Sequence, residues 1–168
     1  MRSEDSRTFA NFVRREQPAL LRLAVLLAGD RGHAEDLVQT ALIACYRHWP
    51  RIVRSGTPTA YVRRAMVTTQ ISWRRRLSST EQVMEDLPEQ AAPVAEQNED
   101  DELRDALRDL PPRMRAAVVL RYFEDLSEKR TAELMGCSPS TVNTQTARGL
   151  ERLRASLATP AVVGEERW

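Results

Sequence analysis

The chain has 168 residues, enough for one domain or two small ones, with 42% hydrophobic and 29% charged residues and a formal net charge of +1. No apolar run approaches the roughly 20 residues of a membrane helix, and the first residues lack the apolar core of a signal peptide, so we expect a cytoplasmic protein without membrane insertion. The two cysteines, Cys45 and Cys137, lie far apart in apolar helical patterns, which favours buried small hydrophobes over a disulfide framework.

Leucine, alanine and arginine dominate the composition and strand-favouring runs are scarce, so the sequence predicts an all-α fold. Residues 6–77 are expected to form a four-helix bundle, the first of two domains. The first helix carries Phe9, Phe12 and Val13 at helical spacing. Pro18 is expected to open a second helix, which ends near Gly29.

A third helix is predicted from Ala34 to Trp49, with Asp30 or Gly32 as its cap and Pro50 as its end. Residues 51–58 follow as a predicted loop, because the Ser-Gly-Thr-Pro sequence at 55–58 is a strong break signal.

The fourth predicted helix, Thr59 to Arg76, has two different faces. Its expected core positions are Val62, Met66, Thr69 and Trp73, and its opposite face carries Arg63, Arg64, Thr68, Ser72, Arg74 and Arg75. The helix belongs to a block, residues 37–80, that has eight arginines and no Asp or Glu. A solvated face usually mixes both signs of charge, so a face of arginines and hydroxyls favours contact with a nucleic-acid backbone.

Residues 78–99 are predicted to form an acidic, flexible linker. The stretch from Leu77 to Leu103 contains nine Asp or Glu residues, no Lys or Arg, and two prolines. Few of its residues can anchor a core and its charges repel one another, so extended conformations are expected.

The second predicted domain spans residues 100–157, and residues 158–168 are expected to be a loose tail. Its helices are predicted at 102–110, 113–124, 127–135 and 138–157, and the last two form a helix-turn-helix across Gly136. The outward positions of its last helix, with the capping serine included, are Ser138, Ser140, Thr141, Asn143, Thr144, Gln145 and Arg148. An ordinary helical hairpin with a polar face is the alternative, but side chains of this kind in such a place bind base edges and phosphates.

The sequence lacks a catalytic constellation. Cys45 and His48 have the spacing of half a metal site, but no second half follows. Phosphate-binding glycine loops, nucleophile elbows and paired-carboxylate motifs are also missing. We therefore expect no enzyme activity, no metal and no cofactor.

In this order and spacing, the predicted helices and their motifs resemble those of the bacterial RNA polymerase sigma factors of the extracytoplasmic-function group, most closely an actinobacterial subgroup. The resemblance covers residues 6–157. Residues 35–39 and 46–49 resemble the segment that grips the polymerase clamp, residues 60–76 the −10-recognition helix of sigma region 2, and residues 110–154 the −35-binding domain of sigma region 4. The resemblance implies a subunit that binds core RNA polymerase and directs promoter-specific initiation.

The resemblance also implies a partner for three sets of residues. For the β′ clamp helices the set is Asp36, Leu37, Gln39, Thr40 and Arg47, although composition alone indicates only a helix start there. For the −10 element and a base flipped from the duplex it is Arg54, Ser55, Gly56, Thr57, Arg63, Arg64, Thr68, Ser72, Trp73, Arg74, Arg75 and Arg76. For the −35 element, the set consists of the outward residues of the last helix given above. The resemblance also allows the polymerase β flap and an anti-sigma factor as further partners.

Three positions depart from the family pattern. Asn143 stands where a basic residue is common, Thr68 replaces a frequent Asn, and Arg130 stands where Glu often completes a capping box behind Ser127. The first difference leaves the −35 sequence preference open and the second leaves a −10 contact open. The third costs about 1 kcal/mol locally and offers an additional phosphate contact.

Two functions from other classes are alternatives to the sigma factor. A helix-turn-helix repressor or activator would act without polymerase as a dimer on paired half-sites, but a basic helical bundle precedes the motif instead of a receiver-like or ligand-binding domain. A nucleic-acid enzyme would need metal or nucleophile motifs that the sequence lacks.

The resemblance places the acidic linker in the positively charged channels of the polymerase, where its carboxylates would mimic a nucleic acid. A further hypothesis is that residues 82–98 fold back on the arginines of the free protein and discourage DNA binding without polymerase.

Overall fold

The computed structural model describes residues 2–79 and 99–158. Its elements are α1 (Ser3–Ala28), α2 (Arg31–Arg47), α3 (Trp49–Ser55), α4 (Pro58–Ser79), α5 (Glu99–Arg108), α6 (Pro112–Val118), the π-helical turn η1 (Val119–Phe123), α7 (Glu128–Met135) and α8 (Pro139–Ala158). Every regular element in these two ranges is helical, which confirms the all-α prediction. No helix among them is long and apolar enough to span a membrane. The predicted linker and tail lie almost entirely outside the described residues.

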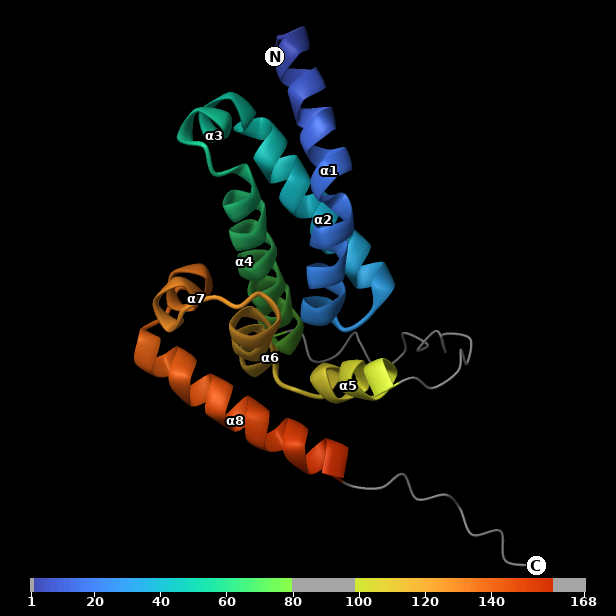
Figure 1. Cartoon of the computed structure of the whole chain (residues 1–168), viewed down its shortest axis with the longest axis vertical. Coiled ribbons are helices and arrows are strands. Elements are labelled where there is room, and N and C mark those ends of the chain that lie inside the picture. Colours follow the sequence, from blue (N-terminus) through green and yellow to red (C-terminus); the bar gives the residue numbers. More distant parts are fainter. Residues whose placement is uncertain (1, 80–98, 159–168) are drawn as a thin grey trace, which may run out of the picture.

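The first domain is a bundle of α1, α2 and α4, with the short α3 across one end (Figure 1). Its interior is built from side chains that are at most 2% exposed: Leu20, Leu23 and Leu27 of α1, Leu37 and Ala41 of α2, and Val62 and Met66 of α4. These positions recur every three or four residues along each helix, so each helix turns one apolar stripe toward the others.

Helix α1 is continuous through Pro18, so the predicted break at this proline is wrong. Proline lacks the N–H that would donate to the carbonyl of Arg14, but both residues are exposed, and water can hydrate that carbonyl. Buried Phe12 on one side of the proline and Leu20 on the other belong to one stripe. Packing of this stripe against α2 outweighs the local cost of the proline.

The start of α2 follows the prediction, but its end does not. The Asp30 carboxylate caps the helix by accepting a hydrogen bond from the backbone N–H of His33 at 2.9 Å. Although partial burial acts in the opposite direction, hydrogen bonds from His33 hold the pKa of Asp30 below its ordinary value. The helix ends at Arg47, and Pro50 lies in the first turn of α3, where proline is well tolerated.

An aromatic cluster fixes α3 to the bundle. The Trp49 ring lies 5.1 Å from that of Phe9 and 5.2 Å from that of Phe12, and Phe9 also meets Tyr46 edge-on at 4.9 Å. The indole N–H of Trp49 donates to the Thr8 hydroxyl at 3.0 Å. The segment 51–55, predicted as part of a loop, is therefore helical and anchored.

The second domain packs α6 at its centre, against α7 and α8 (Figure 1). The predicted helix 113–124 is instead α6 followed by η1, where Glu124 N–H donates to the Val119 carbonyl and Leu126 N–H to that of Leu120. The side chain of Phe123, at the end of this wider turn, is 43% exposed.

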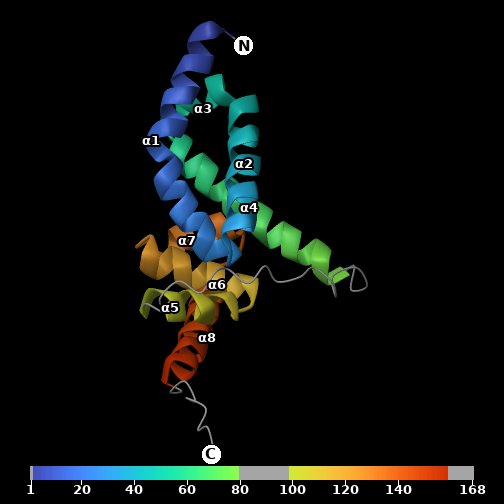
Figure 2. The ribbon, with the colours of Figure 1, turned by 90° about the vertical axis from the view of Figure 1, so that its right-hand side faces the viewer.

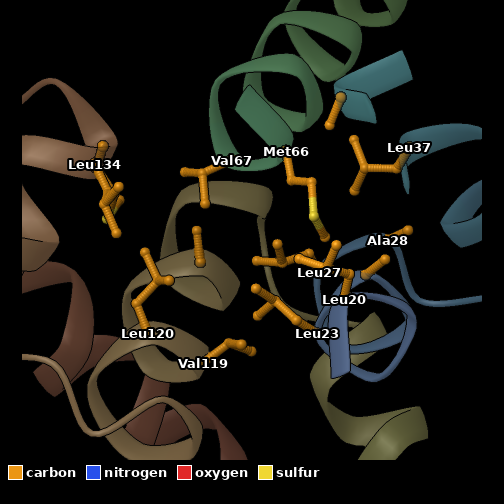
Figure 3. Close-up of a cluster of buried hydrophobic side chains, with 14 of the residues drawn as sticks. Leu20, Leu23, Leu27, Ala28, Leu37, Met66, Val67, Val119, Leu120 and Leu134 are labelled. Carbon is orange, nitrogen blue, oxygen red and sulfur yellow. The ribbon is translucent and has the colours of Figure 1, made fainter. Parts of the chain in front are cut away.

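The two domains share one continuous apolar core. Figure 3 shows Met66 and Val67 of α4 beside Leu23 of α1 and Val119 and Leu120 of the second domain. Figure 2 shows the second domain stacked on one end of the bundle, with the C-terminal end of α4 projecting to one side. The described part of the chain is thus a docked pair of domains.

Candidate nucleic-acid interface

The helix-turn-helix of α7 and α8 is built as the sequence predicts. Gly136 ends α7 at φ 65°, a left-handed conformation that glycine adopts without strain. Ala132 and Val142 are buried where the two helices approach. The core face of α8 is Val142, Thr146, Gly149 and Leu153, so the opposite face of its N-terminal half is open to solvent.

The predicted −35 set lies together on that open half, but its members have different surroundings. The Ser138 hydroxyl accepts from the Thr141 N–H at 3.1 Å and lies 3.0 Å from the Thr141 hydroxyl, and Thr144 donates to the Ser140 carbonyl at 3.1 Å. Ser140, Asn143, Thr144 and Arg148 are exposed, whereas Thr141 and Gln145 are half-buried. The serine and threonine hydroxyls therefore help to hold the helix start.

On α4, the predicted core residues Val62 and Met66 are fully buried, while Thr69 and Trp73 are half-buried. On the predicted DNA face, Arg64 and Thr68 are exposed and Ser72 is half-buried. The backbone of Arg74, Arg75 and Arg76 continues α4, but their side chains lie outside the described part of the structure.

Arg63 is the exception on this face. Its guanidinium forms a 3.1 Å ion pair with Glu124 of the second domain, and the two side chains are 32% and 17% exposed. Sequence reasoning missed Glu124, because nothing in the local pattern of either segment links residues 61 positions apart.

The turn between α3 and α4 holds Ser55, Gly56 and Thr57 in a defined conformation. The Ser55 hydroxyl donates to the Ile52 carbonyl at 2.6 Å and lies 3.2 Å from the Thr57 hydroxyl. Gly56 has φ 73°, and no atom lies within 4 Å of the place where a Cβ would be. The turn is exposed together with Arg54, so an extended ligand has access to its backbone.

The predicted polymerase set on α2 separates into two parts. Asp36, Gln39, Thr40 and Arg47 are exposed on one side of the helix. Leu37 is 0% exposed and points into the core (Figure 3). The prediction that Leu37 contacts a partner is therefore wrong. The side chain of Leu37 packs in the core beneath the exposed residues of α2.

The same side of α2 carries an apolar groove that sequence reasoning missed. A hollow of about 320 Å³ is lined by Phe9, Gln39, Leu42, Ile43 and Tyr46. Ile43 is 54% and Tyr46 38% exposed. The available signal was an isoleucine three residues after Thr40, which puts an apolar side chain on a polar helix face. Exposed apolar surface beside charged groups is typical of a protein-binding site.

The described residues offer no cluster for metal binding, and the thiol of Cys45 is buried. Burial raises the pKa of the Cys45 thiol to about 11, so the group stays protonated near neutral pH and is a poor nucleophile or ligand. No group of three or more His, Cys, Asp or Glu side chains in residues 2–79 and 99–158 is placed to hold a metal ion.

Comparison with known proteins gives matches for both domains. The family "Sigma-70 region 2" matches residues 12–80, and "Sigma-70, region 4" matches residues 100–153. The RNA polymerase sigma-E factor of Streptomyces coelicolor is 40% identical over 151 residues, which covers 89% of this chain and 85% of that protein. The ECF RNA polymerase sigma factor SigE of Mycolicibacterium smegmatis is 32% identical over 87% of this chain and 60% of its own length.

Among solved structures, the chain is similar to the sigma factor RpoE of Bartonella quintana, crystallised with the anti-sigma factor NepR. The TM-score is 0.70 at 21% identity, over 92% of this chain and 99% of that one. At this identity the likeness concerns the fold, and it extends over both domains.

Proposed function

Because the chain belongs to the extracytoplasmic-function group of sigma-70 factors, which act in transcription initiation, we propose that it binds core RNA polymerase and directs it to promoters by contacting a −35 and a −10 element. It acts as a specificity subunit and leaves the polymerisation chemistry to the polymerase. The alternative, a regulator that works without polymerase, does not account for the region 2 match over residues 12–80.

For the −35 element, α8 enters the major groove with its N-terminal half. The exposed side chains of Asn143 and Arg148 suit hydrogen bonding to base edges and phosphates. The hydroxyls of Ser138 and Thr141 already hold the helix start. Their contribution to DNA binding is therefore indirect, because they stabilise the start of the helix that carries Asn143 and Arg148.

For the −10 element, α4 and the preceding turn take unpaired bases of one strand. Arg64 and the arginines at 74–76 attract the backbone, and the open turn at Gly56 lets the protein backbone approach a flipped base. Stacking and pocket contacts of roughly 1–3 kcal/mol per base offset the lost base pairing. Melting then proceeds by capture of the open strand, without any bond-breaking step.

For core polymerase, the exposed side of α2 supplies the contact. Asp36, Gln39, Thr40 and Arg47 provide polar groups, and the groove at Ile43 and Tyr46 provides an apolar centre. An apolar centre with a polar rim is the ordinary composition of a protein interface. An anti-sigma factor is the further partner suggested by RpoE, which was solved with NepR.

The observation that carries the proposal is that one chain combines two candidate DNA-binding helices. One is α8, whose N-terminal half is exposed, and the other is α4, which lies within a sequence block of 44 residues, 37–80, that contains no Asp or Glu. The test is run-off transcription with core polymerase and a randomised promoter library. Addition of the protein should produce transcripts from a subset of templates that share two short elements. If no template in the library is transcribed above the level of core polymerase alone, the proposal is wrong.

A further inference from the structure

A second hollow of the first domain lies where α1 meets α3 and the start of α4. It has a volume of about 250 Å³ and is lined by Thr8, Asn11, Phe12, Arg15, Trp49, Val53 and Pro58. Four of these residues belong to α1, two to α3 and one to α4. The surfaces assigned above to core polymerase, the −10 element and the −35 element use none of them, so the hollow has no assigned ligand.

The floor of this hollow is apolar and held in place. Phe12 and Trp49 are each 3% exposed, and their ring centroids lie 5.2 Å apart. The indole N–H of Trp49 donates to the Thr8 hydroxyl at 3.0 Å, and that hydroxyl donates to the Asp5 carbonyl at 3.0 Å. Because these polar atoms are satisfied within the protein, the floor is a preformed apolar surface of the kind that ligand sites present.

The rim of the hollow combines one apolar side chain with polar and charged ones. Val53 is 45% exposed and extends the apolar surface to the rim. Asn11 is exposed, and its amide offers both hydrogen-bond donors and an acceptor. The Arg15 side chain is 71% exposed, and its Nε pairs with Glu16 at 3.1 Å. A pair this exposed is weak, so the guanidinium can meet an anion as well.

The hollow adjoins the turn that takes a flipped base in the proposed function. Val53 precedes the turn at 55–57 by two residues and Pro58 follows it directly, so both flanks of the turn also line the hollow. Arg54 is exposed between Val53 and the turn. Together with Arg15 it places cationic groups on two of the elements around an apolar site. This combination suits single-stranded DNA, whose phosphates follow the cations while its bases enter the apolar surface.

We propose that this hollow binds a second unpaired base of the strand whose other base enters the turn. The ligand is thus a planar heterocycle of single-stranded DNA. Its ring lies against Val53 and the aromatic floor, Asn11 hydrogen-bonds its polar edge, and Arg15 meets the adjoining phosphate. The inference rests on the proposed function, because it needs a single strand at the turn. A side chain of a partner protein would fill the same volume, but the arginines at 15 and 54 favour an anionic ligand.

The test compares two double variants of the full chain in which no charge changes. The hollow variant, Asn11→Ala with Val53→Ala, shortens two rim side chains. The matched control is Gln17→Ala with Leu157→Ala. Gln17 is an exposed amide on the same helix outside the lining, and Leu157 is a 47% exposed aliphatic residue near the end of α8. All four positions are exposed, so both variants should keep the wild-type circular dichroism spectrum and stability.

The probes are labelled single strands of about twelve nucleotides: oligo(dA), oligo(dC), oligo(dT), and a fourth strand in which an abasic tetrahydrofuran replaces every base. Fluorescence anisotropy gives the affinity of free protein for each strand. The ratio between a base-bearing strand and the abasic strand isolates the base contacts, because both carry the same phosphates. Wild type and control should bind at least one base-bearing strand about tenfold more tightly than the abasic strand, and the hollow variant should lose about three- to tenfold of this preference.

An equal base preference in the hollow variant and the control would overturn the proposal, as would a wild-type protein that binds all four strands alike. A loss that falls equally on the abasic strand would identify a phosphate contact and exclude a base site. Unchanged DNA affinities with weaker retention of core polymerase would assign the hollow to a protein side chain instead. Failure of run-off transcription, with the base preference lowered only in the hollow variant, would count against sigma activity and not against the base site.

Discussion

The side chains on the open half of α8 differ in what they can offer to DNA. Hydroxyl groups at Ser138, Thr141 and Thr144 bind one another or the helix backbone. Asn143 and Arg148 are exposed, and their amide and guanidinium groups can each form two parallel hydrogen bonds to a purine edge. Sequence discrimination should therefore depend more on Asn143 and Arg148 than on the hydroxyls.

Asn143→Ala should relax the preference for one base pair of the −35 element by about 1–3 kcal/mol, because a bidentate base contact carries discrimination of that size. The measurement is run-off transcription from templates that vary at single −35 positions. Arg152→Ala, at an exposed position of the same helix about two and a half turns further on, is the control that should keep the preference. A uniform loss across all templates would mean that Asn143 only positions the helix.

Arg64→Ala combined with Arg75→Ala should weaken open-complex formation and lower its salt sensitivity, because two phosphate contacts are lost. Binding to core polymerase should be unchanged, since α2 lies on another part of the bundle. Permanganate footprinting at several salt concentrations measures the first effect and a pull-down measures the second. Arg22→Ala, on the exposed face of α1, is the control, and an equal loss of core binding in the double variant would refute the assignment.

At the scale of elements, α6 and α8 cross so closely that one position has no room for a side chain. A Cβ on Gly149 would lie 2.6 Å from Val118 Cγ2 and 3.5 Å from the Met114 carbonyl oxygen. Glycine has a lower helix propensity than alanine, but its lack of a side chain allows the two helices to approach this closely. The contact sets the angle between the central helix of the domain and its recognition helix.

Gly149→Ala should lower the free energy of unfolding by about 1–2 kcal/mol, since overpacking against Val118 exceeds the gain in helix propensity. Gly32→Ala is the matched control, because its Cβ would meet only Asp30 Oδ1 at 3.5 Å, and it should be neutral or slightly stabilising. Urea denaturation followed by circular dichroism distinguishes the two. Equal stability of both variants would show that Val118 can move aside without cost.

Local patterns predicted the helices well and their boundaries less well. The buried positions Val62 and Met66 of α4 and the caps at Asp30 and Ser138 agree with the structure. The prolines failed as signals for a physical reason: Pro18 is overridden by a continuous buried stripe, and Pro50 opens a helix instead of ending one. The π-helical turn at 119–123 leaves no mark in the periodicity, because it depends on how η1 meets its neighbours.

The candidate sites, too, could be predicted from the sequence only in part. Exposure of Asp36, Gln39 and Arg148 follows from helix periodicity. The burial of Val67 and the pairing of Arg63 with Glu124 do not, because both arise from contact between segments distant in sequence. The polymerase- and DNA-binding roles of these residues stay predictions.

For the whole molecule, the block of arginines at 37–80 receives a counter-charge from the second domain. Sequence reasoning expected this compensation from the acidic linker, and residues 82–98 lie outside the described part of the chain. Within that part, Glu124 supplies the charge. The linker hypothesis therefore stays a prediction, separate from the contact between domains.

The buried Arg115 connects the second domain to the first. It is 2% exposed, and its guanidinium donates to the carbonyls of Leu107, Arg108 and Leu110 as well as to that of Leu27, at 2.8–2.9 Å. Carbonyls at the C-terminal ends of α1 and α5 thus stabilise a charge that would be costly to bury alone. Three of these four bonds are made within the second domain, and the one to Leu27 joins it to the first.

Arg115→Met should lower the stability of the protein by about 3–5 kcal/mol, because the apolar side chain leaves several buried carbonyls without a donor. The loss should fall on the second domain and on docking, so differential scanning calorimetry should show a lower-temperature transition for α5–α8 ahead of the bundle. Arg113→Met, on the same helix but half-buried, is the control and should keep the wild-type profile. A single, equally stable transition in both variants would mean that water or neighbouring groups replace the guanidinium, and that docking does not depend on Arg115.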